Sequence, residues 1–439
     1  GGTVGDYENG FYIEALRELA FEEGPNSTCF VALTYIIEPP ILGEQKSKAA
    51  QLGIKRLMEA GIQPHIVACR AQKQVTETVR QKISMFSNVP LGRVFSMHDR
   101  ESIYTIPESM RGEGLDREVL SILNLHNRVN VGHEDRARGA WSDFSNKIRS
   151  PRKHRINLGI LGKYAALRDA YASVDKAIEH ATTHLSVQAD VRWIDTSEIT
   201  PANVAQRMGD DIHAVIVPGG FGERGVEGKI ACVQHVRQTG IPYLGLCLGL
   251  QVAVIDYARN VANLKGANST EFEAATPHPV VCELPEQRRI EGMGGSMRLG
   301  GQEVLLDEGS LASFLFDGRT MIRERFRHRF EVNPEYAQQL AEAGLRFSGR
   351  HPLHPIMQVI ELPTEGPHGH PYFIAAQFHP ELTSRPLRPQ PMFMGLIAAA
   401  IARSRPEMQI ETISPRWLRA PLEGGAVHPL RTPAAAAAR

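Results

Sequence analysis

The chain has no excess of charge of either sign and no long apolar run. Its 49 Lys and Arg residues balance its 49 Asp and Glu residues, so no global field would attract nucleic acid or an acidic membrane surface. No stretch reaches the roughly 18 apolar residues of a membrane-spanning helix, and the N-terminus lacks the regions of a signal peptide. The sequence therefore predicts neither a nucleic-acid partner nor a membrane partner.

Cysteine is scarce, and a phosphate-binding loop is missing. The five cysteines are scattered, odd in number and without metal-ligand spacing, a usage that suits a reducing cytoplasm. Gly159–Tyr164 faintly resembles a phosphate loop, but it lacks the G-x-x-x-x-G-K-[ST] spacing and a hydroxyl after the lysine. The chain thus carries no recognisable loop for the phosphates of ATP.

The 439 residues favour two or three domains, and residues 1–125 alternate strand-like with helical patterns. This alternation predicts a parallel sheet covered by helices. The expected strands are Thr28–Ile36, Pro64–Ala71 and Arg93–Met97, and the expected helices are Ile13–Glu22, Glu44–Ala60 and Val75–Phe86.

Residues 126–155 are polar and basic and break the alternation. A solvated interdomain linker is the favoured interpretation, and an anion-binding segment is the alternative. A second alternating unit covers residues 156–402, and the Pro- and Ala-rich end, 403–439, is expected to be a disordered tail. The expected strands of the second unit are Ile156–Leu161, Ala189–Ile194, Ala214–Val217, Pro242–Leu246, Glu303–Leu306, Ile356–Leu362 and Tyr372–Phe378.

The most informative stretch is Pro242–Gln251, where an apolar run stops at Cys247 between two glycines. It predicts a buried strand that turns sharply into a helix with the thiol at the corner, because Gly245 and Gly249 leave room beside a nucleophile in a strained turn. The first N–H groups and the dipole of the new helix favour a thiolate there. A buried cysteine that serves only for packing is the alternative.

A glycine-dense turn, Pro218–Gly222, follows the expected strand Ala214–Val217. Such a turn exposes backbone N–H groups at the carboxyl edge of a sheet, where ligands bind in open α/β folds. We expect the N–H of Gly220 and that of Leu248, the residue after the cysteine, to form a two-donor oxyanion hole.

His379 and Glu381 follow a further apolar strand, Tyr372–Phe378. Because positions i and i+2 of an extended segment face the same side, we expect the imidazole and the carboxylate to form a hydrogen bond. A histidine held in this way can take the proton of a thiol and deliver it to a leaving amine. The pair alone is a coincidence in most proteins, but three strand-end motifs in this order indicate a Cys-His-Glu triad.

These three motifs together resemble a triad-type glutamine amidotransferase domain, and the chain from residue 1 to about 402 is similar to the CTP synthase family. The resemblance implies an α/β fold of two domains, each a mostly parallel sheet flanked by helices. These are an incomplete P-loop-type amidoligase (synthetase) domain at 1–125 and a flavodoxin-like class I glutamine amidotransferase domain at 156–402. The stretches that carry the narrower resemblance are Gly1–Asp6, Gly61–Pro64, Asn268–Phe272, Gly294–Gly300 and Glu324–Val332.

The resemblance implies a C–N ligase that aminates UTP to CTP with ammonia from glutamine, which Cys247, His379 and Glu381 would hydrolyse. A carboxylate such as Glu271 can pair with the ammonium of glutamine, and a guanidinium such as Arg329 with its carboxylate. A structural ion pair is the alternative for these two residues. The implied glutamine-binding residues are Gly220, Leu248, Gly249, Leu250, Gln251, Glu271 and Arg329.

In the first domain, the resemblance implies that ATP and Mg²⁺ serve to phosphorylate the 4-oxygen of UTP before amination. Lysines opposite a triphosphate fit simple electrostatics, although a solvated helix face explains them equally well. No metal ligand is expected in this chain, because the acidic magnesium ligands of the family belong to a part that would precede Gly1. The implied UTP- or CTP-binding residues are Asp6, Tyr7, Glu8, Lys46, Ser47, Lys48, Ala49, Ala50, Gln51 and Lys82.

The sequence departs from the family in three places. The chain opens on Gly1 in place of methionine, so we expect a fragment that keeps glutaminase chemistry and whose residues 1–125 are poorly stable alone. Residues 46–51 read K-S-K-A-A-Q where K-T-K-P-T-Q is usual. Ala172 stands where the family usually has a lysine near the region linked to GTP, which leaves GTP activation open.

The resemblance further implies a cytoplasmic homotetramer. A non-catalytic, CTP-binding regulatory or filament-forming relative is the main alternative, and CTP binding without turnover would favour it. An amidotransferase that serves another acceptor is a third hypothesis, which would require a different first domain.

Overall fold

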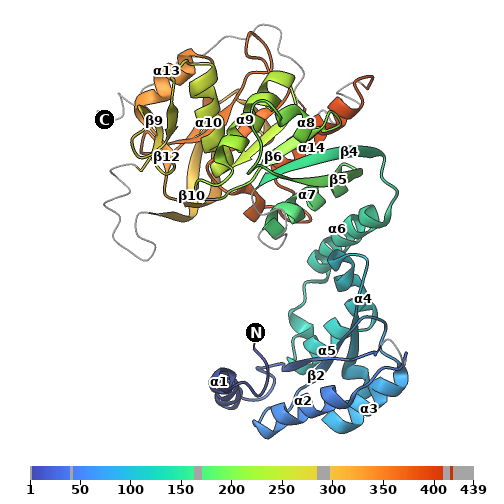
Figure 1. Ribbon diagram of the computed structural model, residues 1–439. Helices are drawn as coiled ribbons and strands as arrows, with labels where there is room; N and C mark the ends of the chain where they lie inside the picture. Colours follow the sequence, from blue (N-terminus) through green and yellow to red (C-terminus); the bar gives the residue numbers. More distant parts are fainter. Residues whose placement is uncertain (1, 40–42, 163–170, 284–296, 409–415, 419–439) are drawn as a thin grey trace. The chain divides into compact units, whose positions relative to one another are not determined.

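The computed structural model describes residues 2–39, 43–162, 171–283, 297–408 and 416–418. The chain divides into two compact units, Gly1–Ile148 and Arg149–Arg439 (Figure 1). The boundary falls within 126–155, the segment predicted as a linker, most of which forms helix α6 (Val131–Arg149). Two aromatic side chains attach α6 to unit 1, since Phe144 is buried and Trp141 Nε1 donates a hydrogen bond of 2.9 Å within the unit.

Unit 1 is built on a parallel sheet of three strands in the order β1-β2-β3. The predicted alternation of strands and helices is confirmed here, with shifts of a few residues at the ends. The elements after α1 are β1 (Val31–Tyr35), α2 (Lys48–Glu59), β2 (Ile66–Ala71), α3 (Glu77–Ser87), β3 (Val94–His98), α4 (Ile106–Gly112) and α5 (Leu115–Ile122).

The central strand β2 is covered on both faces, which explains why it reads as a continuous apolar run. On one face Val67 shares a core with Ile54 of α2. On the other face Ile66 packs with Phe95 of β3 and Ile122 of α5. Unit 1 is therefore a three-layered α/β structure around β2.

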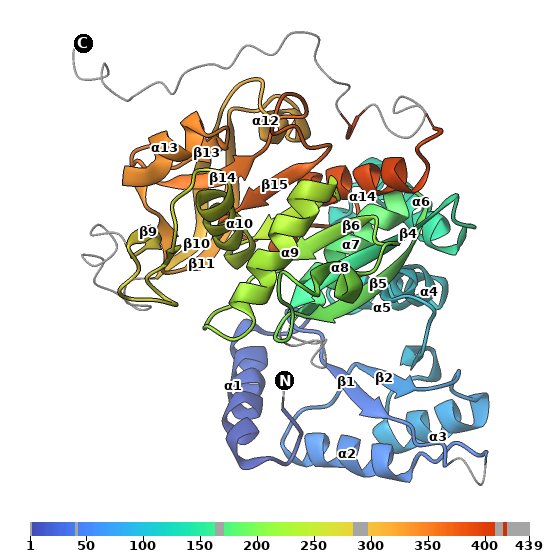
Figure 2. The ribbon, with the colours of Figure 1, turned by 45° about the horizontal axis from the view of Figure 1, so that its top comes forward.

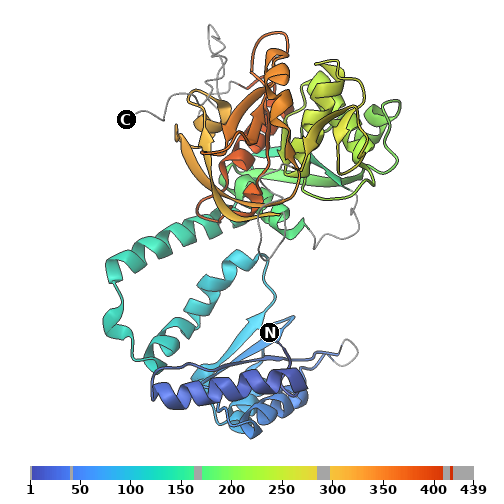
Figure 3. The ribbon, with the colours of Figure 1, turned by 90° about the vertical axis from the view of Figure 1, so that its left-hand side faces the viewer.

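Two elements of unit 1 present apolar side chains to solvent. Helix α1 (Tyr7–Glu23, dark blue in Figure 3) buries none of its residues, and Tyr7 is 84% exposed. Strand β1 leaves Leu33 74% exposed. These residues contribute little to the core of unit 1.

Unit 2 contains a nine-stranded sheet in the order β11-β10-β13-β14-β15-β7-β6-β4-β5 among the described residues. The strands from β15 to β5 are parallel, and those from β11 to β15 are antiparallel. The parallel half contains β4 (His154–Gly162), α7 (Ala172–His184), β5 (Val187–Asp195), α8 (Val204–Met208), β6 (Ala214–Val217), α9 (Val226–Thr239), β7 (Tyr243–Leu246), α10 (Leu248–Asn260) and β15 (Phe373–Ala376).

The remaining elements of unit 2 extend the sheet or cover its ends. A small separate sheet has the order β12-β9-β8. The bounds are β8 (Ala267–Ser269), β9 (His278–Cys282), β10 (Arg298–Leu306), α12 (Leu311–Leu315), β11 (Met321–His328), β12 (Glu331–Val332), α13 (Ala337–Glu342), β13 (Arg346–Arg350), β14 (Met357–Glu361) and α14 (Pro391–Ser404).

The two faces of the large sheet bury two apolar cores. On one face Ile160 and Leu244 pack with Leu396 of α14. On the other, Val215 and Tyr243 pack against α9 and α10, which lie side by side (Figure 2). Within the described parts of the chain, no helix is both long and apolar enough to cross a membrane.

The segment predicted as a disordered tail, 403–439, begins inside helix α14. Residues 409–415 and 419–439 lie outside the described residues. Between them, Arg416 forms an ion pair with Asp317 and Leu418 is buried in the core. These contacts join residues 416–418 to unit 2.

Candidate active site

Cys247 occupies the corner between strand β7 and helix α10, where the sequence predicts it. Its φ of 52° and ψ of −97° are strained for a residue with a side chain. The corner is held by Cys247 N, which donates a 2.7 Å hydrogen bond to the carbonyl of Ala376. A Cβ on Gly245 would lie 2.7 Å from that of Ala375, so glycine is required beside the cysteine.

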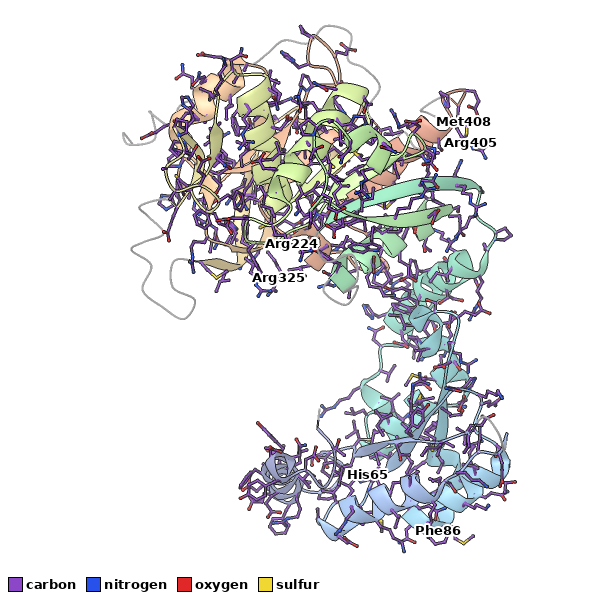
Figure 4. All side chains as sticks on the ribbon, viewed as in Figure 1. His65, Phe86, Arg224, Arg325, Arg405 and Met408 are labelled. Carbon is purple, nitrogen blue, oxygen red and sulfur yellow. The ribbon has the colours of Figure 1, made fainter. Side chains whose placement is uncertain are left out.

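His379 and Glu381 are in contact, with His379 Nδ1 2.7 Å from Glu381 Oε1. The predicted pairing is present, but the extended geometry expected for it is not, because Glu381 lies in a 3₁₀ turn, Pro380–Leu382. It is this turn, and not an extended strand, that brings the side chains of His379 and Glu381 together. His379 N also donates to the carbonyl of Arg325 on β11, labelled in Figure 4, at 2.8 Å.

The imidazole of His379 and the thiol of Cys247 border the same glycine. A Cβ on Gly219 would lie 2.8 Å from His379 Cε1 and 3.6 Å from Cys247 Cβ. Burial alone would lower the pKa of His379, but the adjacent Cys247 and Glu381 side chains raise it to about 10. The site therefore favours an imidazolium at neutral pH.

These side chains line a pocket of about 530 Å³, a volume suited to a small polar ligand. Seven predicted site residues line it: Gly220, Cys247, Gln251, Glu271, Arg329, His379 and Glu381. Leu248, Gly249 and Leu250 do not. All three are buried in the first turn of α10, and Leu248 Cδ2 would lie 3.5 Å from a Cβ on Gly220.

The pocket also has lining residues that the sequence did not predict. Several of them are direct sequence neighbours of predicted residues. The spacing of a motif points to its central residue and does not show which neighbours also line the pocket. Tyr171 and Ser173 come from a different part of the chain, and no motif signals them. The unpredicted lining residues are Tyr171, Ser173, Val174, Pro218, Gly219, Phe221, Met297, Arg327, His328, Phe330 and Leu382.

Gln377 is a further residue at the site that was not predicted. Its side chain is fully buried, and its Nε2 lies 3.5 Å from Cys247 Sγ. The available signal was its position, two residues before His379, at the end of the same strand. A glutamine in an apolar strand requires partners for its amide, and here one partner is the sulfur.

Glu271 and Arg329 enter the pocket from different segments. Glu271 Oε1 accepts a 3.1 Å hydrogen bond from the N–H of Gly222, which ties it to the glycine-dense turn. Arg329 follows β11 and is exposed. A carboxylate and a guanidinium thus border one cavity, as recognition of an α-amino acid requires.

A buried ion cluster supports the pocket wall on both sides of Arg329. Glu331 Oε1 lies 2.8 Å from Arg298 Nε and 2.9 Å from His328 Nε2. Burial would raise the pKa of Glu331, but its interactions with His328 and Arg298 hold it below its ordinary value. The ionised carboxylate can therefore fix residues 328 and 331 around Arg329.

Glu324 of β11 forms a hydrogen bond close to the triad, and its carboxyl group changes its protonation near neutral pH. Its Oε2 accepts a 2.7 Å hydrogen bond from Thr383. Burial raises the pKa of Glu324 to about 7, the hydrogen bond from Thr383 opposes this, and the charge of Glu381 adds to it. Glu324 is thus partly protonated at neutral pH.

Glu324→Gln is expected to stabilise unit 2 at pH 8 and to leave it unchanged at pH 5. The raised pKa means that the stability contributed by protonated Glu324 is full below about 4.5 and is lost as the pH rises through about 7. The difference between the two pH values should be on the order of 3 kcal/mol. Urea unfolding of both proteins at both pH values measures it. Glu303→Gln, at an exposed position on β10, is the control. An equal effect of Glu324→Gln at pH 5 and pH 8 would contradict the assignment.

The residues implied for nucleotide binding lie in unit 1. Ser47 precedes helix α2, and Gln51 Nε2 donates a 2.9 Å hydrogen bond to its hydroxyl. Lys46 pairs with Glu44 at 2.5 Å, and Lys48 Nζ lies 5.9 Å from the ring of Phe86, labelled in Figure 4.

The other implied nucleotide residues divide between helices. Lys48, Ala49, Ala50 and Gln51 begin α2, Lys82 lies in α3, and Asp6 precedes α1, in which Tyr7 and Glu8 are the first residues. The hydrogen bond from Lys46 lowers the pKa of Glu44, and the charge of Lys82 adds a smaller effect, so Lys46 and Lys82 share one acidic neighbour. Two of the lysines therefore gather beside the start of α2.

Comparison with known proteins shows to which family the chain belongs. Residues 1–125 match the family described as CTP synthase N-terminus, and residues 166–399 match glutamine amidotransferase class-I. The CTP synthase of Methanopyrus kandleri is 42% identical over 402 residues, which cover 91% of this chain and 72% of the relative. That of Thermococcus gammatolerans is 41% identical, over 92% and 73%. The chain belongs to the CTP synthase family.

A solved structure supports the same assignment for unit 2. The glutaminase domain of Trypanosoma brucei CTPS with bound acivicin is 34% identical to this chain, with a TM-score of 0.50. The match covers 56% of this chain and 93% of that structure. The chain is thus a glutamine-dependent C–N ligase of the CTP synthase type, which favours the enzyme over a non-catalytic CTP-binding relative.

Proposed function

We propose that unit 2 hydrolyses glutamine at Cys247, His379 and Glu381, and that the ammonia serves the amination of UTP to CTP. The observation that carries the proposal is the contact of His379 with Glu381 beside a strained cysteine corner, within one pocket. A core cysteine that serves only for packing does not require a positive φ or a bordering imidazole.

The geometry suggests the order of the steps. The sulfur of Cys247 attacks the side-chain amide carbon of glutamine, and the N–H groups of Gly220 and Leu248 receive the oxyanion. His379, held through Nδ1 by Glu381, donates a proton to the amide nitrogen, whose C–N bond breaks so that ammonia leaves and a thioester remains. Water then adds to the thioester with His379 as the base, and the C–S bond breaks, which releases glutamate and regenerates the sulfur of Cys247.

We propose that Glu271 and Arg329 bind the α-amino and α-carboxylate groups of glutamine. Leu248, Gly249, Leu250 and Gln251 at the start of α10 would supply the remaining contacts, mainly through their backbone. Both charged side chains border the pocket. Neither forms a hydrogen bond with Cys247 among the described residues. They would therefore act on binding more than on the chemical step.

Arg329→Ala is expected to raise KM for glutamine about 30- to 100-fold and to change kcat less than about threefold. A charge-assisted hydrogen bond to a ligand contributes roughly 2–3 kcal/mol, and this one is made equally before and during the reaction. Steady-state ammonia release measures both constants. Arg323→Ala, which removes an exposed arginine of β11 outside the pocket, is the control. A fall in kcat with unchanged KM would contradict the binding role.

The synthetase reaction of the family uses ATP and typically Mg²⁺. The described residues contain no group of three or more His, Cys, Asp or Glu side chains that could hold a metal ion, and the sequence has no phosphate loop. For UTP or CTP we propose residues 6–8, 46–51 and 82, of which the lysines would meet the phosphates.

Domain limits, control and assembly follow from the same resemblance. We propose a synthetase domain at 1–125, a connecting segment at 126–155, an amidotransferase domain at 156–402 and a tail at 403–439. We further propose GTP as an activator, a homotetramer and a cytoplasmic location, in which the thiol of Cys247 stays reduced. Ammonia release with and without GTP tests the proposal that GTP is an activator.

A further inference from the structure

The side chains of Gln251, Gln377 and Cys247 are buried and form a chain of hydrogen bonds that ends at the sulfur of Cys247. Gln251 Nε2 donates to the carbonyl of Phe330 at 2.9 Å and to Gln377 Oε1 at 3.3 Å. Gln377 Nε2 in turn lies 3.5 Å from Cys247 Sγ. Gln251 is 3% exposed and Gln377 is 0% exposed, so water does not compete for these contacts.

The chain has only one consistent direction. The carbonyl of Phe330 accepts hydrogen bonds and cannot donate, so the amide nitrogen of Gln251 must face it. The same nitrogen then faces Gln377, which must present its oxygen there. The NH₂ group of Gln377 is consequently turned toward the sulfur of Cys247. Flipping either amide would place two acceptors or two donors against each other.

We propose that Gln377 is a catalytic residue of the glutaminase reaction, which donates a hydrogen bond to the sulfur of Cys247, and that Gln251 is a positioning residue that fixes its amide. The inference rests on the proposed role of Cys247 as nucleophile. A donor at this place stabilises the thiolate more than the thiol, because a hydrogen bond to a charged acceptor is stronger than one to a neutral acceptor.

The position of Gln377 also bears on the orientation of the Cys247 sulfur. His379 borders the thiol from the side of Gly219, and Gln377 approaches from the end of β15. A sulfur that accepts a hydrogen bond from Gln377 is restricted in its orientation toward the pocket. Gln251 keeps a second function as part of the pocket lining, so one residue would link the glutamine site to the nucleophile.

The test compares Gln377→Met with wild type in the pH dependence of Cys247 alkylation by iodoacetamide. Methionine keeps the length of the side chain and removes the donor. We expect the profile to move to higher pH by about one to two units, and alkylation at pH 7 to slow about tenfold or more. We expect kcat for ammonia release to fall by a similar factor, with KM for glutamine within about threefold.

The matched control is Gln358→Met. Gln358 lies on the neighbouring strand β14, is also fully buried, and accepts the backbone N–H of Gln377 through its own carbonyl. Its side-chain amide has no hydrogen-bond partner among the described residues. Its profile should coincide with that of wild type, although its stability can change. Both variants retain the other ionisable groups that line the pocket, which are Tyr171, Glu271, Arg327, His328, Arg329, His379 and Glu381.

Gln251→Met provides a second measurement that does not alter the donor itself. The amide of Gln377 would then be free to rotate, and we expect a shift in the same direction but smaller. A profile of Gln377→Met, or of Gln251→Met should the first variant not fold, that coincides with wild type would overturn the inference. Failure of the proposed function looks different: wild type would then lose no ammonia release when Cys247 is alkylated.

Discussion

Cys247→Ala should abolish ammonia release from glutamine, with a loss of roughly 10⁴-fold or more in kcat. In the proposed mechanism the sulfur of Cys247 forms the bond to the substrate, and no other lining residue of the pocket is a cysteine. Removal of a nucleophile in comparable triads leaves only the rate that binding and the oxyanion hole provide. The measurement is ammonia release at saturating glutamine, together with CTP formation wherever the chain supports it.

Cys232→Ala is the matched control for this variant. Cys232 lies in α9, is fully buried, and burial raises its pKa to about 12. It is therefore a structural thiol in the same unit, and its removal should cost about 1 kcal/mol of stability and leave kcat unchanged. Equal ammonia release by Cys247→Ala and by Cys232→Ala would refute the nucleophile assignment. Amination of UTP with added ammonia should be the same in both variants.

The parallel half of unit 2 could be predicted from sequence because its strands are buried on both faces. Val215–Val217 and Tyr243–Leu246 are continuous apolar runs, and each ends at a glycine-rich turn. The antiparallel half was predicted poorly. Strand β11 alternates exposed and buried residues, but four of its eight residues are Arg or Glu, so it was noticed only as part of a family motif.

Sequence spacing predicts some residues of the candidate site and misses others. Cys247 stands out because glycines flank it, and His379 and Glu381 because they are close in sequence. Gln377 is marked only by its position two residues before His379, and its contact with the sulfur depends on the register of β15 with β7, which places Ala376 beside Leu246. Glu324 was hidden in the same way, since its proximity to Thr383 arises only when β11 reaches the turn after His379.

Gly249→Ala is expected to destabilise unit 2 by more than about 3 kcal/mol, or to prevent its folding. A Cβ on Gly249 would lie 2.4 Å from the carbonyl oxygen of Val217, well inside the contact distance of real side chains. Val217 cannot withdraw, because its strand β6 is paired on both sides in the sheet. The clash must therefore be relieved by moving the first turn of α10.

The same displacement should also reduce ammonia release. The first turn of α10 carries the N–H of Leu248, and Val217 leads directly into the glycine-dense turn that lines the pocket. The measurements are urea unfolding and ammonia release. Gly53→Ala in α2, where nothing lies within 4 Å of the added Cβ, should be neutral or stabilising by up to about 1 kcal/mol. An unfolding free energy of Gly249→Ala within about 0.5 kcal/mol of wild type would show that the strand-to-helix corner is not packed as described.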